Sequence, residues 1–232
     1  MKFLVENIYI VNGGIIRRQI RGIPMGTNCA PVLANLFLYA YESRFIDKLI
    51  GSYSTRSIAP LFHMTFRYID DTLSIDNQHW KKCIDTKEIY PPELVLNDTS
   101  PSDPSDPTHF LGMNIHASDH KSDHFRISVF DKRDSFGFHV RRYPQMASLI
   151  PQTIPYGVFL GQLHRGYRIC TLADDFMDFA TDVARRCISN GCGHRRLSQV
   201  FSSFVSRFAH KWGSCRSLRT RFRSQFQLGS SS

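Results

Sequence analysis

Around residues 63–69, apolar and polar positions alternate. Met64, Phe66 and Tyr68 recur at every second position, which is the period of a strand with one buried face. Asp70 and Asp71 follow directly, and Leu73 and Ile75 resume an apolar run. The pattern therefore predicts a β-hairpin whose turn carries two adjacent carboxylates.

A second apolar segment, residues 32–41, is hydrophobic on nearly every helical face. Thr27 or Asn28 can serve as N-cap, and Pro31 suits the first turn. A helix that is apolar all round is typical of a buried position. We therefore expect a buried helix here.

Two helical stripes occupy the last third of the chain. Asp174 and Asp175 suit the first turn of the first helix, and Gly191 is a plausible stop. The apolar positions recur at intervals of three and four, so the two helices should pair through aromatic faces and leave their arginines outward. The stripes are Phe176, Phe179, Ala180, Val183, Ala184 and Cys187, and then Leu197, Val200, Phe201, Phe204, Val205, Phe208 and Trp212.

Between these regions the chain predicts a loop and a second hairpin. Residues 97–107 are rich in Pro, Ser and Asp, as exposed loops are. Strands Phe110–Ile115 and Phe125–Phe130 should pair across a polar tip. The tip histidines recur every four residues, but the surrounding Ser-Asp repeats favour a flexible turn over a metal site; they are His116, His120 and His124. Together the elements predict an α+β fold.

With 232 residues, of which 42% are hydrophobic, the chain can bury a core and form one or two domains. The charge is uneven: residues 1–182 carry −1, whereas the last fifty contain no acid and carry +10. Such a basic region indicates a nucleic-acid contact, and the alternative is a solvated arginine face. The arginines expected to meet a nucleic-acid backbone are Arg185, Arg186, Arg195, Arg196 and Arg207.

The six cysteines show no spacing typical of a paired zinc site. Cys187, Cys192 and His194 form the one cluster worth weighing, and their place at a predicted helix end favours a cap and turn over zinc. Free thiols indicate a reducing compartment. Without a secretory signal or a long apolar span, the expected location is nuclear or cytoplasmic, with no membrane partner and no secretion.

Asp70 and Asp71 would be costly to bury side by side without a cation that offsets their repulsion. Oxygen ligands of this kind suit Mg²⁺ (or Mn²⁺), which phosphates of a substrate often complete. An ordinary Asp-containing turn is the alternative. Upstream, Gly22 and Gly26 let the backbone approach a ligand ahead of a helix start that can bind phosphate or a base edge, although simple packing also explains such a turn.

GIPMGTNCAPVLAN at 22–35 and FRYIDD at 66–71 together resemble the palm of a reverse transcriptase. Their order and their separation of about 45 residues fit that family. HFLGMNI at 109–115 and ISVFDKRDSFGFHVRRYP at 127–144 are similar to Penelope-like retroelement polymerases. The resemblance covers roughly residues 15–210, and its first third is the most specific.

This resemblance implies a two-metal nucleotidyl transfer with an RNA template, a DNA primer and deoxynucleoside triphosphates as partners. By the same resemblance Asp70 is a metal ligand, Asp71 its partner, and Tyr68 lies under the primer end. The segment that would position nucleotide and template comprises Pro24, Met25 and Gly26. Many members of the family carry Gln where Met25 stands.

The chain departs from the family pattern at the first metal-binding Asp. In the family this residue lies on a strand upstream of the glycine turn. Glu6 is the one acidic residue before Gly22. We therefore expect a partial palm over residues 1–145, a helical basic thumb over residues 146–232, and a need for an upstream polymerase segment. On its own the chain should bind metal weakly and not polymerise. The alternative is a catalytically inactive, nucleic-acid-binding remnant of a mobile element; a purely structural domain leaves the acid-free final fifty residues unexplained.

Overall fold

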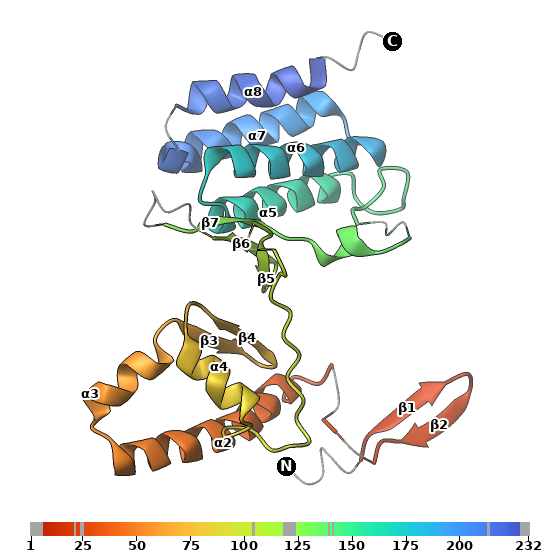
Figure 1. The fold of residues 1–232 in the computed structure, drawn as a ribbon. Coiled ribbons are helices and arrows are strands. Elements are labelled where there is room, and N and C mark those ends of the chain that lie inside the picture. Colours follow the sequence, from red (N-terminus) through yellow and green to blue (C-terminus); the bar gives the residue numbers. More distant parts are fainter. Residues whose placement is uncertain are drawn as a thin grey trace. The chain divides into compact units, whose positions relative to one another are not determined.

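The computed structural model describes residues 7–20, 22–23, 26–103, 105–117, 124–138, 140, 142–212 and 214–227. Within them the chain is mixed α and β, with seven α-helices and three small antiparallel sheets (Figure 1). It divides into two compact units, Met1–Asp98 and Thr99–Ser232. Each unit has its own hydrophobic cluster. The mixed class of fold expected from the sequence is confirmed.

The first unit contains two hairpins and a long helix. Its strands are β1 (Tyr9–Asn12), β2 (Ile15–Arg18), β3 (Thr65–Tyr68) and β4 (Asp71–Ser74), with β1 paired to β2 and β3 to β4. Its helices are α2 (Ala30–Ser52), α3 (Thr55–Ile58), the 3-10 helix η1 (Ala59–Phe62) and α4 (Gln78–Asp85). The core of this unit is small: its buried cluster consists of Phe45, Cys83, Ile89 and Tyr90.

Hairpin β3–β4 faces the opposite way from the sequence-based expectation. Phe66 and Tyr68 should be half-buried, but their side chains are 50% and 57% exposed. Thr65 and Arg67 face inward instead, where Arg67 meets Glu42 of α2 and Thr65 accepts a hydrogen bond from the Asn77 side chain at the start of α4. The expectation is wrong because alternation fixes which residues share a face, not which face the rest of the chain covers.

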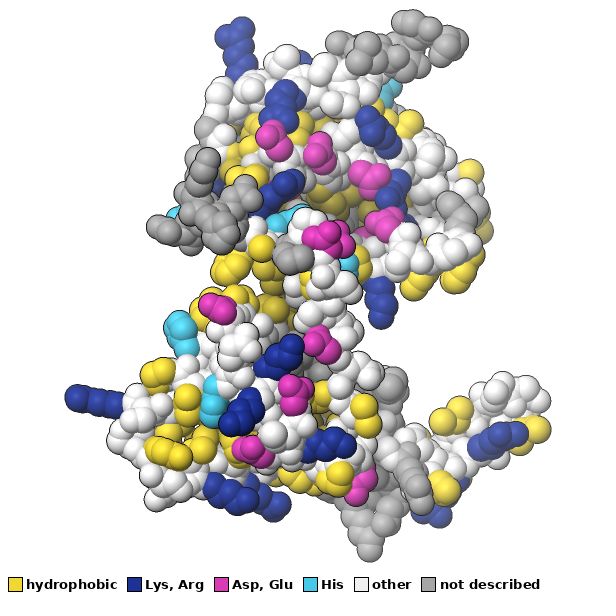
Figure 2. Space-filling view, viewed as in Figure 1, with side chains coloured by type: hydrophobic (Ala, Val, Ile, Leu, Met, Phe, Trp, Pro, Cys, Tyr) yellow, Lys and Arg dark blue, Asp and Glu magenta, His cyan; other side chains and the backbone are white. Residues whose placement is uncertain are grey.

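Helix α2 is also more exposed than its sequence predicts. Its N-cap is Cys29, one or two residues after the predicted start, with Pro31 in the first turn. Val32, Leu36 and Tyr39 expose more than half of their surface. The expectation of a buried helix is wrong because, in the described part of this unit, the cluster around Phe45 covers one face of α2 and leaves the others open. Apolar side chains also reach the surface on hairpin β1–β2, at the lower right of Figure 2.

The second unit is a helical layer on a three-stranded sheet (Figure 1). The strands are β5 (Thr108–Phe110), β6 (Met113–His116) and β7 (Arg126–Val129), with β6 in the centre. The helices are the 3-10 helix η2 (Lys132–Ser135), α5 (Ile154–Ile169), α6 (Ala173–Ser189), α7 (His194–Phe208), the 3-10 helix η3 (Ala209–Trp212) and α8 (Cys215–Gln227).

Phenylalanine rings fill the core of this unit. Phe176 of α6 stacks on Phe201 and Phe204 of α7, at centroid distances of 6.2 and 6.0 Å. Phe201 also stacks on Phe222 of α8, at 3.9 Å and an interplanar angle of 7°. The predicted pairing of α6 and α7 through aromatic faces is confirmed. Helices α5 and α8, which complete this core, were not among the predicted elements.

The boundary between the compact units lies at Asp98, earlier than the division at residue 145 expected from the sequence. Strand β7 explains the difference, because it is attached to the helices: Arg126 forms an ion pair with Asp175 of α6 at 2.6 Å. The backbone N–H of Thr171 also donates to the carbonyl of Ile127. The predicted strand Phe110–Ile115 is itself two strands, since Leu111 and Gly112 turn the chain between β5 and β6.

Two glycines of α5 provide a matched test of this packing. A Cβ on Gly166 would lie 2.7 Å from a ring carbon of Phe179, whereas a Cβ on Gly161 would meet nothing within 4 Å. We predict that Gly166→Ala lowers the free energy of unfolding of the second unit by about 1–3 kcal/mol, through overpacking. Gly161→Ala should raise it by about 0.5–1 kcal/mol, because alanine is the better helix former.

The measurement is urea unfolding followed by Trp212 fluorescence in a Trp80→Phe background, since each unit contains one of the two tryptophans. Changes of the same sign in both variants would contradict the close approach of α5 and α6.

Candidate functional site

The two aspartates lie at the tip of hairpin β3–β4. Tyr68 pairs with Asp71, so Ile69 and Asp70 form a two-residue turn. Ile69 has φ of +55°. Glycine is the usual residue at the first position of such a turn, and a β-branched residue there costs on the order of 1–3 kcal/mol. Met64, Asp76 and Lys87 of this unit also have positive φ, but among these four residues Ile69 is the β-branched one, and it lies next to the two aspartates. Strain clusters at functional sites, so this turn is the leading candidate in the described part of the first unit.

Both carboxylates are accessible. Asp70 and Asp71 are exposed to solvent. Because cross-strand partners share a face, Asp71 lies on the same face as Tyr68, and Phe66 lies beside Leu73 on that face. The outward face of the hairpin therefore combines a carboxylate with aromatic rings, both open to a ligand.

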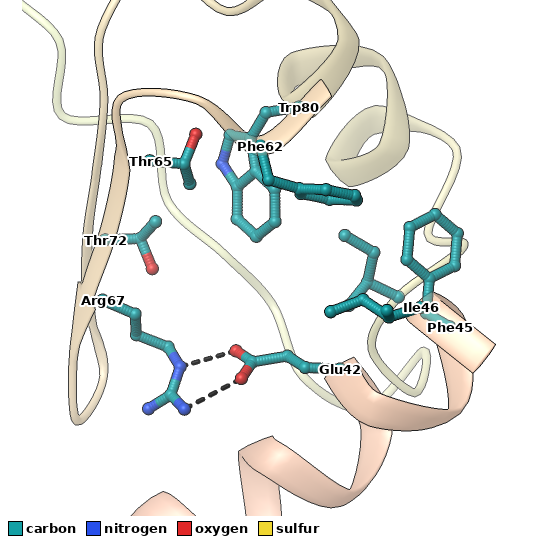
Figure 3. A pocket seen from close by; sticks show the side chains of 9 residues that line it. Glu42, Phe45, Ile46, Phe62, Thr65, Arg67, Thr72 and Trp80 are labelled. Atoms are coloured by element: carbon teal, nitrogen blue, oxygen red, sulfur yellow. Dashed lines mark hydrogen bonds and ion pairs between the residues drawn. The ribbon is translucent and has the colours of Figure 1, made fainter. Parts of the chain in front are cut away.

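Arg67 holds the strained turn in place from behind. Its Nε and Nη2 donate to the two carboxylate oxygens of Glu42, at 2.5 and 2.9 Å (Figure 3). Its Nη1 donates to the carbonyl of Ile69 at 3.0 Å and to the side chain of Asn35 at 2.8 Å. One guanidinium thus ties the left-handed residue of the turn to two positions of helix α2.

Glu42 has a second partner, the hydroxyl of Tyr90, which donates to it at 2.7 Å. Burial, and after it the hydrogen bond to Glu42, raises the pKa of Tyr90 above its ordinary value. The hydrogen bond to Glu42 also raises the pKa of Arg67. Both groups therefore keep their protons over the physiological pH range, and the network stays intact.

Behind the hairpin lies an open pocket of about 180 Å³. Figure 3 shows the Glu42–Arg67 pair at one side of this pocket and the ring of Trp80 at the other. The pocket lining is Glu42, Phe45, Ile46, Phe62, Thr65, Arg67, Thr72, Trp80 and Ile89. The pocket and the exposed aspartate tip are thus linked through Arg67.

Asp70 and Asp71 together offer two of the oxygen ligands that Mg²⁺ accepts. Among the described residues no group of three or more His, Cys, Asp or Glu side chains lies close enough to hold a metal. Two carboxylates completed by substrate phosphates and water are nevertheless a common arrangement for Mg²⁺. The pair therefore fits part of a magnesium site. Glu6, the possible further ligand, lies outside the described residues.

Four residues are expected to position nucleotide, template or primer, and the structure describes two of them, Gly26 and Tyr68. The φ of Gly26 is +91°, and a Cβ there would meet nothing within 4 Å. The glycine is thus required by the backbone conformation and not by crowding. Pro24 and Met25 lie outside the described residues.

The five arginines expected to contact nucleic acid lie in the second unit, on α6 and α7. Arg185 donates to Gln225, and Arg196 stacks over the ring of Tyr156 at 4.4 Å. Arg195 and Arg207 are exposed, with no hydrogen bond or ion pair to another described residue. On the visible face of this unit, basic side chains are interspersed with acidic ones (Figure 2). The basic surface is therefore partly neutralised.

Arg186 illustrates this neutralisation. It forms ion pairs with Asp134 at 3.1 Å and with Asp182 at 2.8 Å. Next to it Asp131 accepts hydrogen bonds from Arg133 and Arg142. These bonds, chiefly those from Arg133, lower the pKa of Asp131 from 3.8 to about 2.

Comparison with family models, curated proteins and solved structures returns no match. The resemblance to reverse transcriptases therefore rests on the motifs themselves. In the described part of the chain, no helix has both the length and the apolar character needed to cross a membrane.

Sequence reasoning missed the residues that support the turn. Glu42 directly follows the apolar run 32–41 of α2, and Arg67 is the basic residue that interrupts strand β3. Their opposite charges on otherwise apolar elements were an available signal of pairing. The left-handed conformation of Ile69 had no comparable signal, since isoleucine is an unusual residue for that position.

We predict that Ile69→Gly raises the free energy of unfolding of the first unit by about 1 kcal/mol, because glycine adopts the left-handed conformation without strain. Urea unfolding followed by Trp80 fluorescence in a Trp212→Phe background checks this. Ile75→Gly is the matched control: its φ is not positive, so the same change should lower stability. A destabilised Ile69→Gly variant would show that side-chain packing outweighs the strain.

The Asp131 carboxylate predicts a pH dependence. Its folded pKa lies below its unfolded value, so the stability it contributes is present above pH 3.8 and is lost as the pH falls towards about 2. Asp131→Asn should therefore destabilise the second unit at neutral pH. The difference in free energy of unfolding between the variant and wild type should become smaller as the pH falls from 3.8 to about 2. Urea unfolding followed by Trp212 fluorescence measures this difference. A difference that does not change with pH would contradict the stabilising role of the ionised Asp131 carboxylate.

Proposed function

We propose that this chain carries part of the palm, together with the thumb, of an RNA-directed DNA polymerase of the reverse transcriptase type, from a retroelement similar to the Penelope-like group. The observation that carries the proposal is the tip of hairpin β3–β4. There a left-handed Ile69, bonded through its carbonyl to Arg67, presents two adjacent aspartates to solvent. A strained turn that displays two carboxylates is hard to explain by stability alone.

In this proposal Asp70 and Asp71 hold Mg²⁺ or Mn²⁺ together with the phosphates of an incoming deoxynucleoside triphosphate. The metal, when bound, supplies activation of the primer hydroxyl and neutralisation of charge on the transferred phosphate. Tyr68 shares the face of Asp71 and supports the primer end. Gly26 belongs to the segment that approaches the templating base and the nucleotide.

The second unit fits the role of the thumb. Arg195 and Arg207 are exposed on α7 and lie on a unit whose final fifty residues carry +10. Contacts of this kind bind the phosphate backbone of a template–primer duplex without reading its sequence. The phenylalanine core packs α7 against its neighbouring helices, which sets where the backbone of these arginines lies.

A second candidate function is nucleic-acid binding without catalysis. It is favoured by one observation: no third carboxylate, cysteine or histidine joins Asp70 and Asp71 in a metal-binding group within the described residues. The basic second unit would retain its affinity for nucleic acid in either case.

Primer extension on an RNA template with Mg²⁺ tests the proposal. The assay uses this chain and the same chain fused to an upstream segment that carries the family's first metal-binding aspartate, each with and without Asp70→Asn. We expect extension products from the longer chain. The Asp70→Asn variant should reduce them by on the order of 10²-fold or more, because the amide binds the cation poorly.

Asp76→Asn is the matched control, because Asp76 is also exposed and lies six positions further along the same segment. It should leave extension unchanged. Extension that survives Asp70→Asn would overturn the assigned role of this aspartate. Absence of extension from every protein, with retained binding to duplex, would favour the second candidate.

A further inference from the structure

The segment after η2 carries two exposed aromatic rings that the proposed polymerase chemistry does not use. Phe136 and Phe138 stack on each other, with ring centroids 5.4 Å apart and an interplanar angle of 16°. Phe138 is 71% exposed and Phe136 42%. Because the two rings are stacked, both lie on the same side of this segment. The outer ring therefore offers a flat apolar surface to solvent.

The two rings line an open cavity of about 310 Å³ within the second unit. Apart from Val140 and Tyr143, the rest of its lining is polar or charged, and convergent polar groups beside aromatic rings are typical of a ligand site. The cavity is lined by Arg133, Asp134, Phe136, Phe138, Val140, Arg142, Tyr143, Arg186, Ser189 and Asn190.

The three arginines that line the cavity differ in their exposure and in which of their guanidinium nitrogens already contact a carboxylate. The side chain of Arg142 is 9% exposed and is shared by Asp131 and Asp134. Arg133 and Arg186 are 38% and 31% exposed. Their carboxylate contacts use Nε and Nη2 and leave Nη1 outside those contacts. Each can therefore donate to a further anion without breaking its ion pair.

We propose that this cavity binds an unpaired nucleotide of a single-stranded nucleic acid, with the base stacked on Phe138 and its phosphate held by Arg133 and Arg186. Bases inside a duplex already stack on each other. An exposed protein ring therefore stacks on a base that has left the duplex or belongs to a single strand. The choice of nucleic acid as the partner rests on the proposed function. The basic final fifty residues of the same unit would draw the strand to this cavity.

The test is fluorescence anisotropy with the full chain and a labelled oligouridine of about 12 nucleotides, a length within the usual site size. Chelator is present and triphosphate is left out, so neither metal nor triphosphate contributes to binding. We expect Phe138→Ala to weaken binding by about 10-fold, the loss typical of one stacked base. Phe138→Leu should weaken it similarly, because leucine is apolar but has no ring, and Phe138→Trp should retain it.

An oligonucleotide that lacks bases but keeps the phosphates provides the matched ligand. It should bind wild type as weakly as oligouridine binds Phe138→Ala. Leu149→Ala controls for the loss of an exposed apolar side chain in the same unit and should leave binding unchanged. Far-UV circular dichroism confirms that the variants are folded.

Three outcomes would overturn the inference: no binding of oligouridine, equal binding by Phe138→Leu and wild type, or equal binding of the base-free strand. The second and third would leave the aromatic pair as an apolar protein contact. Failure of the proposed polymerase function would instead appear in primer extension, which this measurement does not involve.

Discussion

The Glu42 carboxylate, shared by Arg67 and Tyr90, is the contact on which the geometry of the first unit depends. It joins helix α2, strand β3 and the segment after α4, which are far apart in sequence. The buried cluster of this unit has only a few side chains, so apolar packing alone gives little to fix the hairpin. The side chains of Arg67 and Glu42 are 18% and 21% exposed, and at that degree of burial loss of one partner typically costs about 1–3 kcal/mol.

The second unit is stabilised in a different way. Its helices close around fully buried phenylalanines. The Arg221–Asp174 ion pair lies at the surface, where such a pair contributes little, whereas Arg126 and Arg142 pair with the largely buried carboxylates of Asp175 and Asp131. The two units therefore respond differently to conditions: the polar network of the first is sensitive to the loss of a single hydrogen-bonding partner, whereas the apolar core of the second depends on shape and volume. The candidate site on the first unit thus depends on the polar network, which is more easily perturbed than the apolar core of the second unit.

Sequence reasoning succeeded where one physical rule decided the outcome. Helices α6 and α7, which contain Phe176 and Phe201, each have one apolar face. The burial of these faces and the pairing of the two helices could therefore be predicted from the periodicity. It failed for Phe66 and Tyr68, because two-residue alternation is symmetric and Glu42, twenty-five residues before Arg67, decides which face turns inward. The turn at Ile69 could not be foreseen either, since its conformation runs against the preference of isoleucine. The aspartates themselves were visible in the sequence, but their supporting residues were not.

Hairpin β1–β2 has a consequence for the behaviour of the protein in solution. It is a two-stranded sheet, and among the residues that the structure describes no third strand pairs with either of its outer edges. All of its residues are exposed, including Val11 and Ile16 at 69% and 70%. Open edges with β-branched side chains favour intermolecular strand pairing, and Arg17 and Arg18 oppose it by charge repulsion. Colloidal stability of the purified chain should therefore decline as added salt screens these two charges.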